Sequence, residues 1–198
     1  MYDWRRMTPE ERDETLRLRQ LERRPWHSVP HRVSTDGRYL LTAACYEHRP
    51  HVGLTRDRMA SFERELLSVC EPFATEITAW VLLPNHYHLL LHTLELAELL
   101  AQLGRLHGRT AHRWNGEDDA RGRRVWCGVA ETAMKSDRHF WASVNYVHHN
   151  PVKHGYVEHW QEWPFGNARE YLELVGREEA ERVWKDFPIG SFGEGWDD

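Results

Sequence analysis

Short apolar segments alternate with longer amphipathic ones from residue 38 to residue 150. Apolar runs between turn signals are typical of buried strands, whereas apolar side chains at every third or fourth position are typical of helices. On these criteria we expect four strands, at residues 38–46, 76–83, 86–92 and 123–130. We expect three helices, at residues 55–70, 95–114 and 137–150, the last of them ended by Pro151.

The predicted order is β-α-β-β-α-β-α, with the turn Pro84-Asn85 joining the middle two strands as a hairpin. This order favours an α+β domain with a ferredoxin-like antiparallel sheet flanked by helices. Capping signals at Thr8 predict a further helix over residues 8–24, and an acidic helix is expected over residues 168–186. We therefore divide the chain into three parts, which are an N-terminal helical extension (1–37), a central α+β domain (38–165) and an acidic C-terminal helical tail (166–198).

The composition is that of a soluble protein. The chain has 198 residues and a mean hydropathy of -0.74, and no stretch approaches the roughly 18 apolar residues of a membrane span. Its N-terminus is charged from Asp3 onward, unlike a secretory signal peptide. Its three cysteines are widely spaced, so a disulfide framework is not expected. We predict a cytoplasmic protein with no membrane partner.

The net charge of -5 conceals an uneven distribution. Residues 161–198 carry 4 Lys and Arg against 10 Asp and Glu, so the remaining chain is nearly balanced. Local basic clusters rather than net charge bind phosphate groups. The candidates are Arg105, Arg109 and Arg113, spaced as one ridge of a helix, and then Arg123 and Arg124. The alternative for any one cluster is an ordinary solvated surface.

His86 and His88 flank Tyr87 in a predicted strand. Side chains alternate along a strand, so the two histidines project from one face and could chelate a metal ion with a third ligand from elsewhere. With 14 histidines in the chain, one such pair is expected by chance. Two histidines on a half-exposed strand are therefore the alternative interpretation.

Tyr146 belongs to the predicted helix over residues 137–150. It lies roughly 120° from the apolar stripe of that helix, which places it off the centre of the core. Asn150 follows at i+4 beside it, and Lys153 lies one turn further if the helix continues. The three could form one edge of an active site, although a tyrosine packed at the core margin would give the same pattern. His148, His149 and His154 are competing ligand or proton-transfer candidates.

Taken together, these motifs resemble a known family. Residues 83–90 (LPNHYHLL) look like the His-hydrophobic-His motif of the single-strand HUH transposases, and residues 146–157 (YVHHNPVKHGYV) look like their tyrosine helix. The chain is most similar to the REP-associated tyrosine transposases over about residues 38–172. Supporting matches are residues 40–46, 104–110, 138–141 and 160–164. Tyr87 departs mildly from the pattern, because smaller aliphatic residues are common at the middle position, and Gly166-Asn167 replaces a commoner pair of serines.

The resemblance implies the ferredoxin-like fold and the role of each residue. Tyr146 would attack a DNA phosphodiester to leave a 5′-phosphotyrosine and a free 3′-OH. His86, His88 and Asn150 would hold Mg²⁺ or Mn²⁺, of which Mn²⁺ suits imidazole ligands better. The basic residues, with Lys153, would contact single-stranded or hairpin DNA.

The function implied is that of a single-strand DNA endonuclease and strand transferase acting on hairpin-forming palindromic repeats. One alternative is a DNA-binding protein of the same fold that has lost turnover. Another is a metal-binding domain with no nucleic-acid role, against which the arginine clusters argue. Relatives act as monomers or as homodimers that exchange the tyrosine helix, and both states remain open for this chain.

Overall fold

The computed structural model describes residue 8 and residues 36–190 of the chain. The predicted helix over residues 8–24 therefore lies outside the described residues. In chain order the elements are β1 (Arg38–Ala44), η1 (Tyr46–His48), η2 (Val52–Leu54), α2 (Arg56–Cys70), β2 (Glu76–Leu82), β3 (His86–His92), α3 (Leu96–Glu117), β4 (Ala130–Ala133), α4 (Asp137–Lys153), η3 (Trp160–Glu162), α5 (Ala168–Val175) and α6 (Arg177–Asp186).

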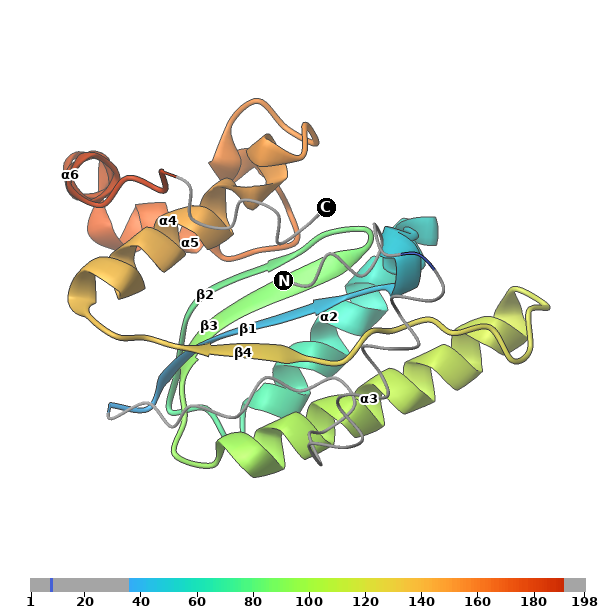
Figure 1. The fold of residues 1–198 in the computed structure, drawn as a ribbon. Coiled ribbons are helices and arrows are strands. Elements are labelled where there is room, and N and C mark those ends of the chain that lie inside the picture. The colour runs from blue at the N-terminus through green and yellow to red at the C-terminus, as the bar shows by residue number, and fades with distance from the viewer. Residues whose placement is uncertain (1–7, 9–35, 191–198) are drawn as a thin grey trace.

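The four strands form one antiparallel sheet in the order β2-β3-β1-β4. Neighbouring strands β2 and β3 form the predicted hairpin, whereas α2 and α3 connect strands that are not hairpin partners (Figure 1). This is the connectivity of the β-α-β-β-α-β ferredoxin-like motif. The predicted fold class, an α+β protein with an antiparallel sheet flanked by helices, is confirmed.

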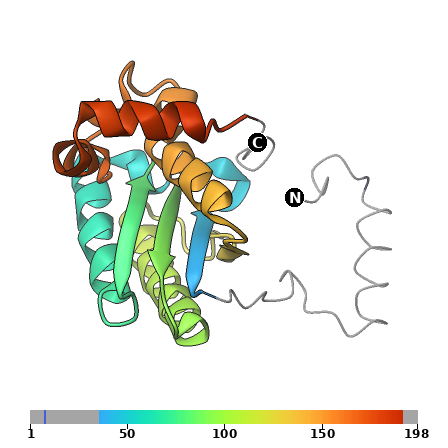
Figure 2. The ribbon, with the colours of Figure 1, turned by 90° about the vertical axis from the view of Figure 1, so that its left-hand side faces the viewer.

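The sheet separates two hydrophobic clusters. Helices α2 and α3 cover one face and α4 crosses the other, as the two ribbon views show (Figures 1 and 2). Alternation along β3 divides its side chains between them, with Leu89 and Leu91 on the α2 and α3 side and Leu90 on the α4 side. His86 and His88 share the parity of Leu90, so they face α4.

Tyr87 points to the opposite face from the histidines and is fully buried. Its ring contacts Phe62 and Trp126, with centroids 6.0 and 6.1 Å away. Its hydroxyl lies 3.2 Å from Nε2 of His107, whose pKa burial lowers to about 4, so a neutral His107 can accept this hydrogen bond at pH 7. The aromatic residue between the two histidines therefore belongs to the core beneath α3.

The helices differ from the prediction in three places, and the first is α3, which runs to Glu117 rather than to residue 114. Helix α4 does not end before Pro151 but continues to Lys153, and His154 N then donates to Asn150 O at 3.1 Å. The proline sits in the last turn, where it costs one intrahelical hydrogen bond, and the packing of the buried helix body offsets that cost. The acidic segment predicted as one helix is two, because Gly176 adopts φ 81° and ψ 161° between α5 and α6.

The fourth strand was also predicted too early. Residues 123–129 run beside the sheet end with one isolated bridge, between Cys45 and Trp126, and regular pairing begins only at Ala130. The side chain of Trp126 packs flat against His107, with centroids 4.3 Å apart. The apolar character that indicated a strand in this segment reflects its packing against α3.

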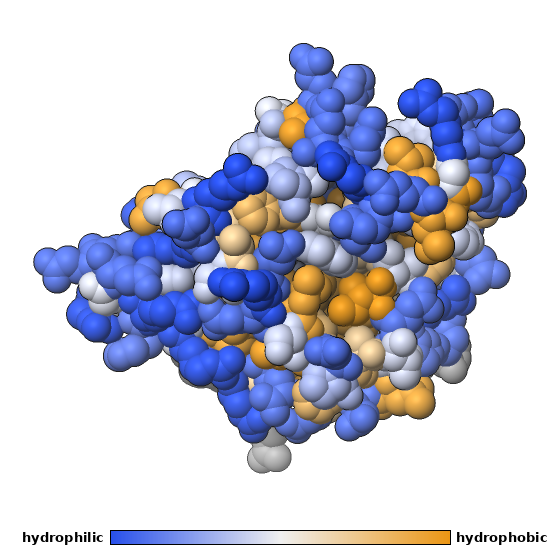
Figure 3. All heavy atoms as spheres, turned by 180° about the vertical axis from the view of Figure 1, so that it is seen from behind, coloured by the Kyte–Doolittle hydropathy of each residue, from blue (hydrophilic) through white to orange (hydrophobic). Residues whose placement is uncertain are grey.

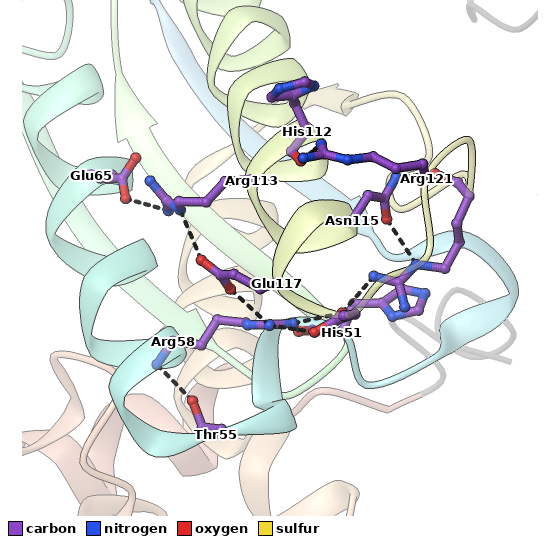
Figure 4. Close-up of polar contacts among 11 residues, drawn as sticks. His51, Thr55, Arg58, Glu65, His112, Arg113, Asn115, Glu117 and Arg121 are labelled. Atoms are coloured by element: carbon purple, nitrogen blue, oxygen red, sulfur yellow. Dashed lines mark hydrogen bonds and ion pairs between the residues drawn. The ribbon is translucent and has the colours of Figure 1, made fainter.

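A buried ion-pair network ties α2 to the end of α3 (Figure 4). The Arg58 guanidinium is 8% exposed and donates to Asp118 at 2.6 and 3.1 Å and to Glu117 at 2.8 Å. Arg123 also donates to Oδ2 of Asp118, at 2.6 Å. Hydrogen bonds from these two guanidinium groups lower the pKa of Asp118 to about 2, and the bond from Arg58 has the larger effect.

We expect Arg58→Met to lower the free energy of unfolding by about 2 kcal/mol at pH 7, because it leaves Asp118 short of a charged donor. A depressed carboxyl pKa contributes stability above its unfolded value of about 3.9, and this contribution is lost as the pH falls toward 2. The variant should therefore lose less stability between pH 4 and pH 2 than the parent protein, as urea unfolding would measure. Arg64→Met, which removes an exposed arginine of the same helix, is the control; an equal effect of both would contradict the network's role.

The face of the molecule behind Figure 1 is mainly hydrophilic, with apolar side chains in small groups (Figure 3). Among the described residues no helix is long and apolar enough to cross a membrane.

Candidate active site

The structure brings together in one chain the four residues predicted for catalysis and metal binding. His86 and His88 extend from β3 toward α4, with ring centroids 5.0 Å apart. From α4, Asn150 Oδ1 lies 3.0 Å from Nε2 of His86, and the ring of Tyr146 lies 5.1 Å from that of His88. Because Tyr146 and Asn150 are four residues apart on α4, they meet both histidines at once.

Each histidine is oriented by a partner that the sequence reasoning missed. The hydroxyl of Thr42 lies 2.8 Å from Nδ1 of His88, since Thr42 is paired with His88 across β1 and β3. The side-chain oxygen of Asn85 lies 2.8 Å from Nδ1 of His86. A second hydrogen bond at one ring nitrogen is the usual way in which a protein orients a metal-binding histidine. The nitrogen that a metal ion would take is then Nε2 in both rings.

The contact between His86 and Asn150 joins two atoms that both accept hydrogen bonds, Nε2 of His86 and Oδ1 of Asn150. Asn85 Nδ2 donates to the carbonyl of His48 at 3.1 Å, so Asn85 Oδ1 faces His86 and accepts its Nδ1 proton. In a neutral ring His86 Nε2 then carries a lone pair, and it faces Oδ1 of Asn150 as that amide is oriented. The buried Nδ2 of Asn150 has no hydrogen-bond partner among the described residues.

This arrangement fits a divalent cation. With its amide oxygen toward His86, Asn150 can bind a cation together with His86 Nε2, and with the amide turned over its Nδ2 would donate to that nitrogen instead. Neighbouring ligands of an octahedral ion bound at about 2.1 Å are themselves about 3.0 Å apart. Within the described part of the chain, no three His, Cys, Asp or Glu side chains converge on one point. A metal here would therefore take two imidazoles and one amide from the protein.

Tyr146 differs from its prediction, because it is buried rather than at the border of the core. Its side chain is 1% exposed and packs with Leu40, Val81 and Leu90 in the cluster between α4 and the sheet. The reason is that the side of α4 that carries Tyr146 packs directly on the sheet, where its ring meets His88. The Nζ atom of Lys153 lies 5.3 Å from the centroid of the Tyr146 ring, within cation–π distance.

Of the three competing histidines, one lies near the candidate site and two do not. His148 reaches toward the β2 edge, with Nε2 3.3 Å from Asn167 Oδ1, and His149 packs against Trp184 with centroids 4.8 Å apart. His154 is the one that approaches the site, with its ring centroid 5.1 Å from that of His86.

The predicted arginine ridge lies on the far side of the sheet from Tyr146. Arg105, Arg109 and Arg113 belong to α3, which covers the face opposite α4 (Figure 1). Arg105 pairs with Glu98 at 3.4 Å, and Arg113 pairs with Glu65 at 2.6 Å. The three arginines do belong to one helix, as their spacing predicted, but that helix does not share a surface with Tyr146.

The two arginines of the second basic cluster, Arg123 and Arg124, have different surroundings. Arg123 is held by Asp118 and by Asn115 Oδ1 at 2.9 Å, so its guanidinium has a structural role. Arg124 lies 4.7 Å above the half-exposed ring of Tyr46. Tyr46 follows β1 at the end where Ala44 pairs with His86, which places Arg124 at the same sheet end as the histidines.

The fold and site are those of a ferredoxin-like domain with two histidines on a central strand facing a tyrosine helix. No protein-family model matches the chain. A Haemophilus influenzae protein named as a REP-associated tyrosine transposase is 28% identical over 125 residues, which cover 56% of this chain and 69% of the relative. The REP-associated tyrosine transposase of Escherichia coli is 31% identical over 90 residues, which cover 46% of this chain and only 52% of the relative.

A solved structure, a REP-associated tyrosine transposase bound to a REP hairpin, matches with a TM-score of 0.56 and 21% identity. The match covers 73% of this chain and 84% of the solved one. The resemblance predicted from the sequence is confirmed: this protein is similar in sequence to REP-associated tyrosine transposases and shares the fold of one of them.

Proposed function

We propose that this protein is a metal-dependent single-strand DNA endonuclease and strand transferase that acts beside hairpin-forming palindromic repeats. The observation that carries the proposal is the convergence of Tyr146, His86, His88 and Asn150 within one chain. The solved relative with the same fold is bound to a REP hairpin, which supports hairpin DNA as the partner. Bacterial DNA lies in the cytoplasm, where we expect the protein to act.

In the proposed reaction the hydroxyl oxygen of Tyr146 attacks a DNA phosphorus atom. The bond from phosphorus to the 3′ oxygen breaks, so that strand leaves with a free 3′-OH and the other stays attached as a 5′-phosphotyrosine. The phenolic proton is lost as the 3′ oxygen gains one. The covalent bond retains the energy of the phosphodiester, so a later 3′-OH can rejoin the strand by the reverse reaction.

The surrounding residues prepare this step. A tyrosine hydroxyl has an ordinary pKa near 10 and is a weak nucleophile, so charge that develops on its oxygen must be stabilised. The ammonium group of Lys153 lies 5.3 Å from the centroid of the Tyr146 ring and adds positive charge beside the phenol. Mg²⁺ or Mn²⁺ held by His86, His88 and Asn150 would offset the phosphate charge and orient the phosphate for in-line attack. Thr42 and Asn85 keep the two imidazoles in position.

The proposal is tested by incubating the protein with Mn²⁺ and a 3′-labelled hairpin with single-stranded flanks, made from the repeats beside its own gene. On a denaturing gel, the fragment that carries the new 5′ end should migrate with the protein, and EDTA should abolish it. A free 5′-phosphate product with no protein attached would contradict covalent chemistry at a tyrosine.

The burial of Tyr146 favours one alternative, a DNA-binding protein of the same fold that has lost turnover. At 1% exposure the phenol cannot meet a phosphodiester without a rearrangement that uncovers it. Hairpin binding without any covalent product, across several hairpins and with either metal, would support this alternative.

A further inference from the structure

A cavity lies beside α4, on another side of that helix from Tyr146. It measures about 490 Å³ and is enclosed by α4, η3, α5 and α6. Asn145, His148 and His149 line it, and their side of α4 is roughly 120° from that of Tyr146 and Asn150. Its volume is within the range of about 300–1,000 Å³ that is typical of sites for small molecules.

The walls of the cavity are largely aromatic rings. His148 lies parallel to Trp160, with an interplanar angle of 12° and centroids 5.9 Å apart, and the ring of Tyr171 lies 4.8 Å from that of His148. Trp184 of α6 faces His149 from the other side, with centroids 4.8 Å apart. Flat aromatic walls of this kind bind flat aromatic rings, and they stack nucleobases without regard to sequence.

Two polar atoms in these walls are buried without a hydrogen-bond partner among the described residues. They are the hydroxyl oxygen of Tyr171 and Nδ1 of His149. Burial raises the pKa of Tyr171 and lowers that of His149, so at neutral pH the first is a protonated hydroxyl and the second a neutral ring. Each atom exposes less than 1 Å², so a nucleobase, with donors and acceptors around its edge, would bond to them only after the rings that cover them shift.

Both basic and acidic side chains line the cavity, and a nucleotide could use both, the basic ones at its phosphate and the acidic ones at its base. Lys185 pairs with Glu181 at 3.9 Å, whereas no acidic side chain of the described residues lies within ion-pair distance of Arg177. Arg177 is thus available for a phosphate group. The carboxylates of Glu158 and Glu181 could accept from amino groups on a base edge.

We propose that this cavity binds one unpaired nucleotide, with its base among the aromatic rings and its phosphate toward Arg177. The inference rests on the proposed function if the nucleotide belongs to a DNA strand. A free nucleotide has the same chemistry and would make the cavity a separate binding site.

The test compares the affinity of the protein for two hairpins, with and without a single-stranded extension, by fluorescence anisotropy. Trp184→Ala removes a stacking ring that is 40% exposed and lies outside both hydrophobic clusters, so the packing lost is mainly its contact with His149. We expect it to weaken binding of the extended hairpin about five- to twentyfold and to leave the other hairpin unchanged. Tyr171→Phe keeps the ring and should weaken the extended hairpin about two- to tenfold.

Leu174→Ala is the matched control, because Leu174 is 86% exposed on α5 and does not line the cavity. Calorimetric titration with the four deoxynucleoside monophosphates distinguishes the source of the ligand. Saturable binding that Trp184→Ala abolishes would identify a free nucleotide as the ligand.

Unchanged affinity of both variants for both hairpins, with no monophosphate bound, would overturn the proposal. So would an equal loss on both hairpins, because the residues would then act through the fold. If the parent protein binds neither hairpin, the proposed function fails, and the monophosphate titration alone still decides whether the cavity binds a nucleotide.

Discussion

Tyr146→Phe should lower covalent cleavage of a hairpin substrate by about a thousandfold or more, because the substitution removes the proposed nucleophilic oxygen. The phenyl ring remains, and with it the contacts to His88 and Lys153 that position this part of α4. The affinity for the hairpin and the thermal stability should therefore stay close to those of the parent protein. Gel electrophoresis of the covalent product and anisotropy of the labelled hairpin measure the two effects.

Tyr156→Phe is the matched control, since Tyr156 is half-exposed, lies just beyond the same helix and would lose the same hydroxyl. It should cleave as the parent does. Retained cleavage by Tyr146→Phe would assign the nucleophile elsewhere, and loss of hairpin binding would give Tyr146 a structural role.

His88→Ala should abolish high-affinity Mn²⁺ binding, and Thr42→Val should weaken it by about ten- to a hundredfold. The second effect is expected because residues that orient metal-binding histidines affect metal affinity on that scale. Valine has nearly the shape of threonine but cannot hydrogen-bond to His88 Nδ1, so the sheet should be preserved. Calorimetric titration of the protein with Mn²⁺ measures the affinity without reference to cleavage.

The chain offers a close control for the threonine. Thr75 contacts Nδ1 of His92 at the opposite end of β3, away from the proposed site. Thr75→Val should leave Mn²⁺ affinity unchanged. Equal effects of the two threonine substitutions would show that they act through the strand rather than through a metal ligand.

Much of the fold follows from local patterns. The strand β3 and the helix α2 match their predicted ranges within one residue, since their apolar periodicity and turn signals agree with their tertiary surroundings. The places that failed are those where packing outweighs a local signal. Pro151 is tolerated within the last turn of α4, and Trp126 packs against α3 instead of joining a strand.

The candidate site shows the same division. Alternation along a strand placed His86 and His88 on one face, and the i+4 spacing placed Tyr146 beside Asn150, so each pair was determined by the sequence itself. That the two pairs meet depends on α4 crossing the sheet over the histidine end of β3, which only long-range packing decides.

The partners of these residues were likewise beyond the sequence. Thr42 orients His88 because β1 pairs with β3 in one register, and a shift by one residue would turn Thr42 to the other face. The same holds for burial: the angle of Tyr146 on its helix was correct, but its packing against Leu40, Val81 and Leu90 of the sheet put the phenol inside the protein. The sequence by itself determined which residues share a face of each element, since backbone geometry sets that locally. The tertiary structure decided which faces meet and which are closed to solvent, because those outcomes depend on packing between elements far apart in the chain.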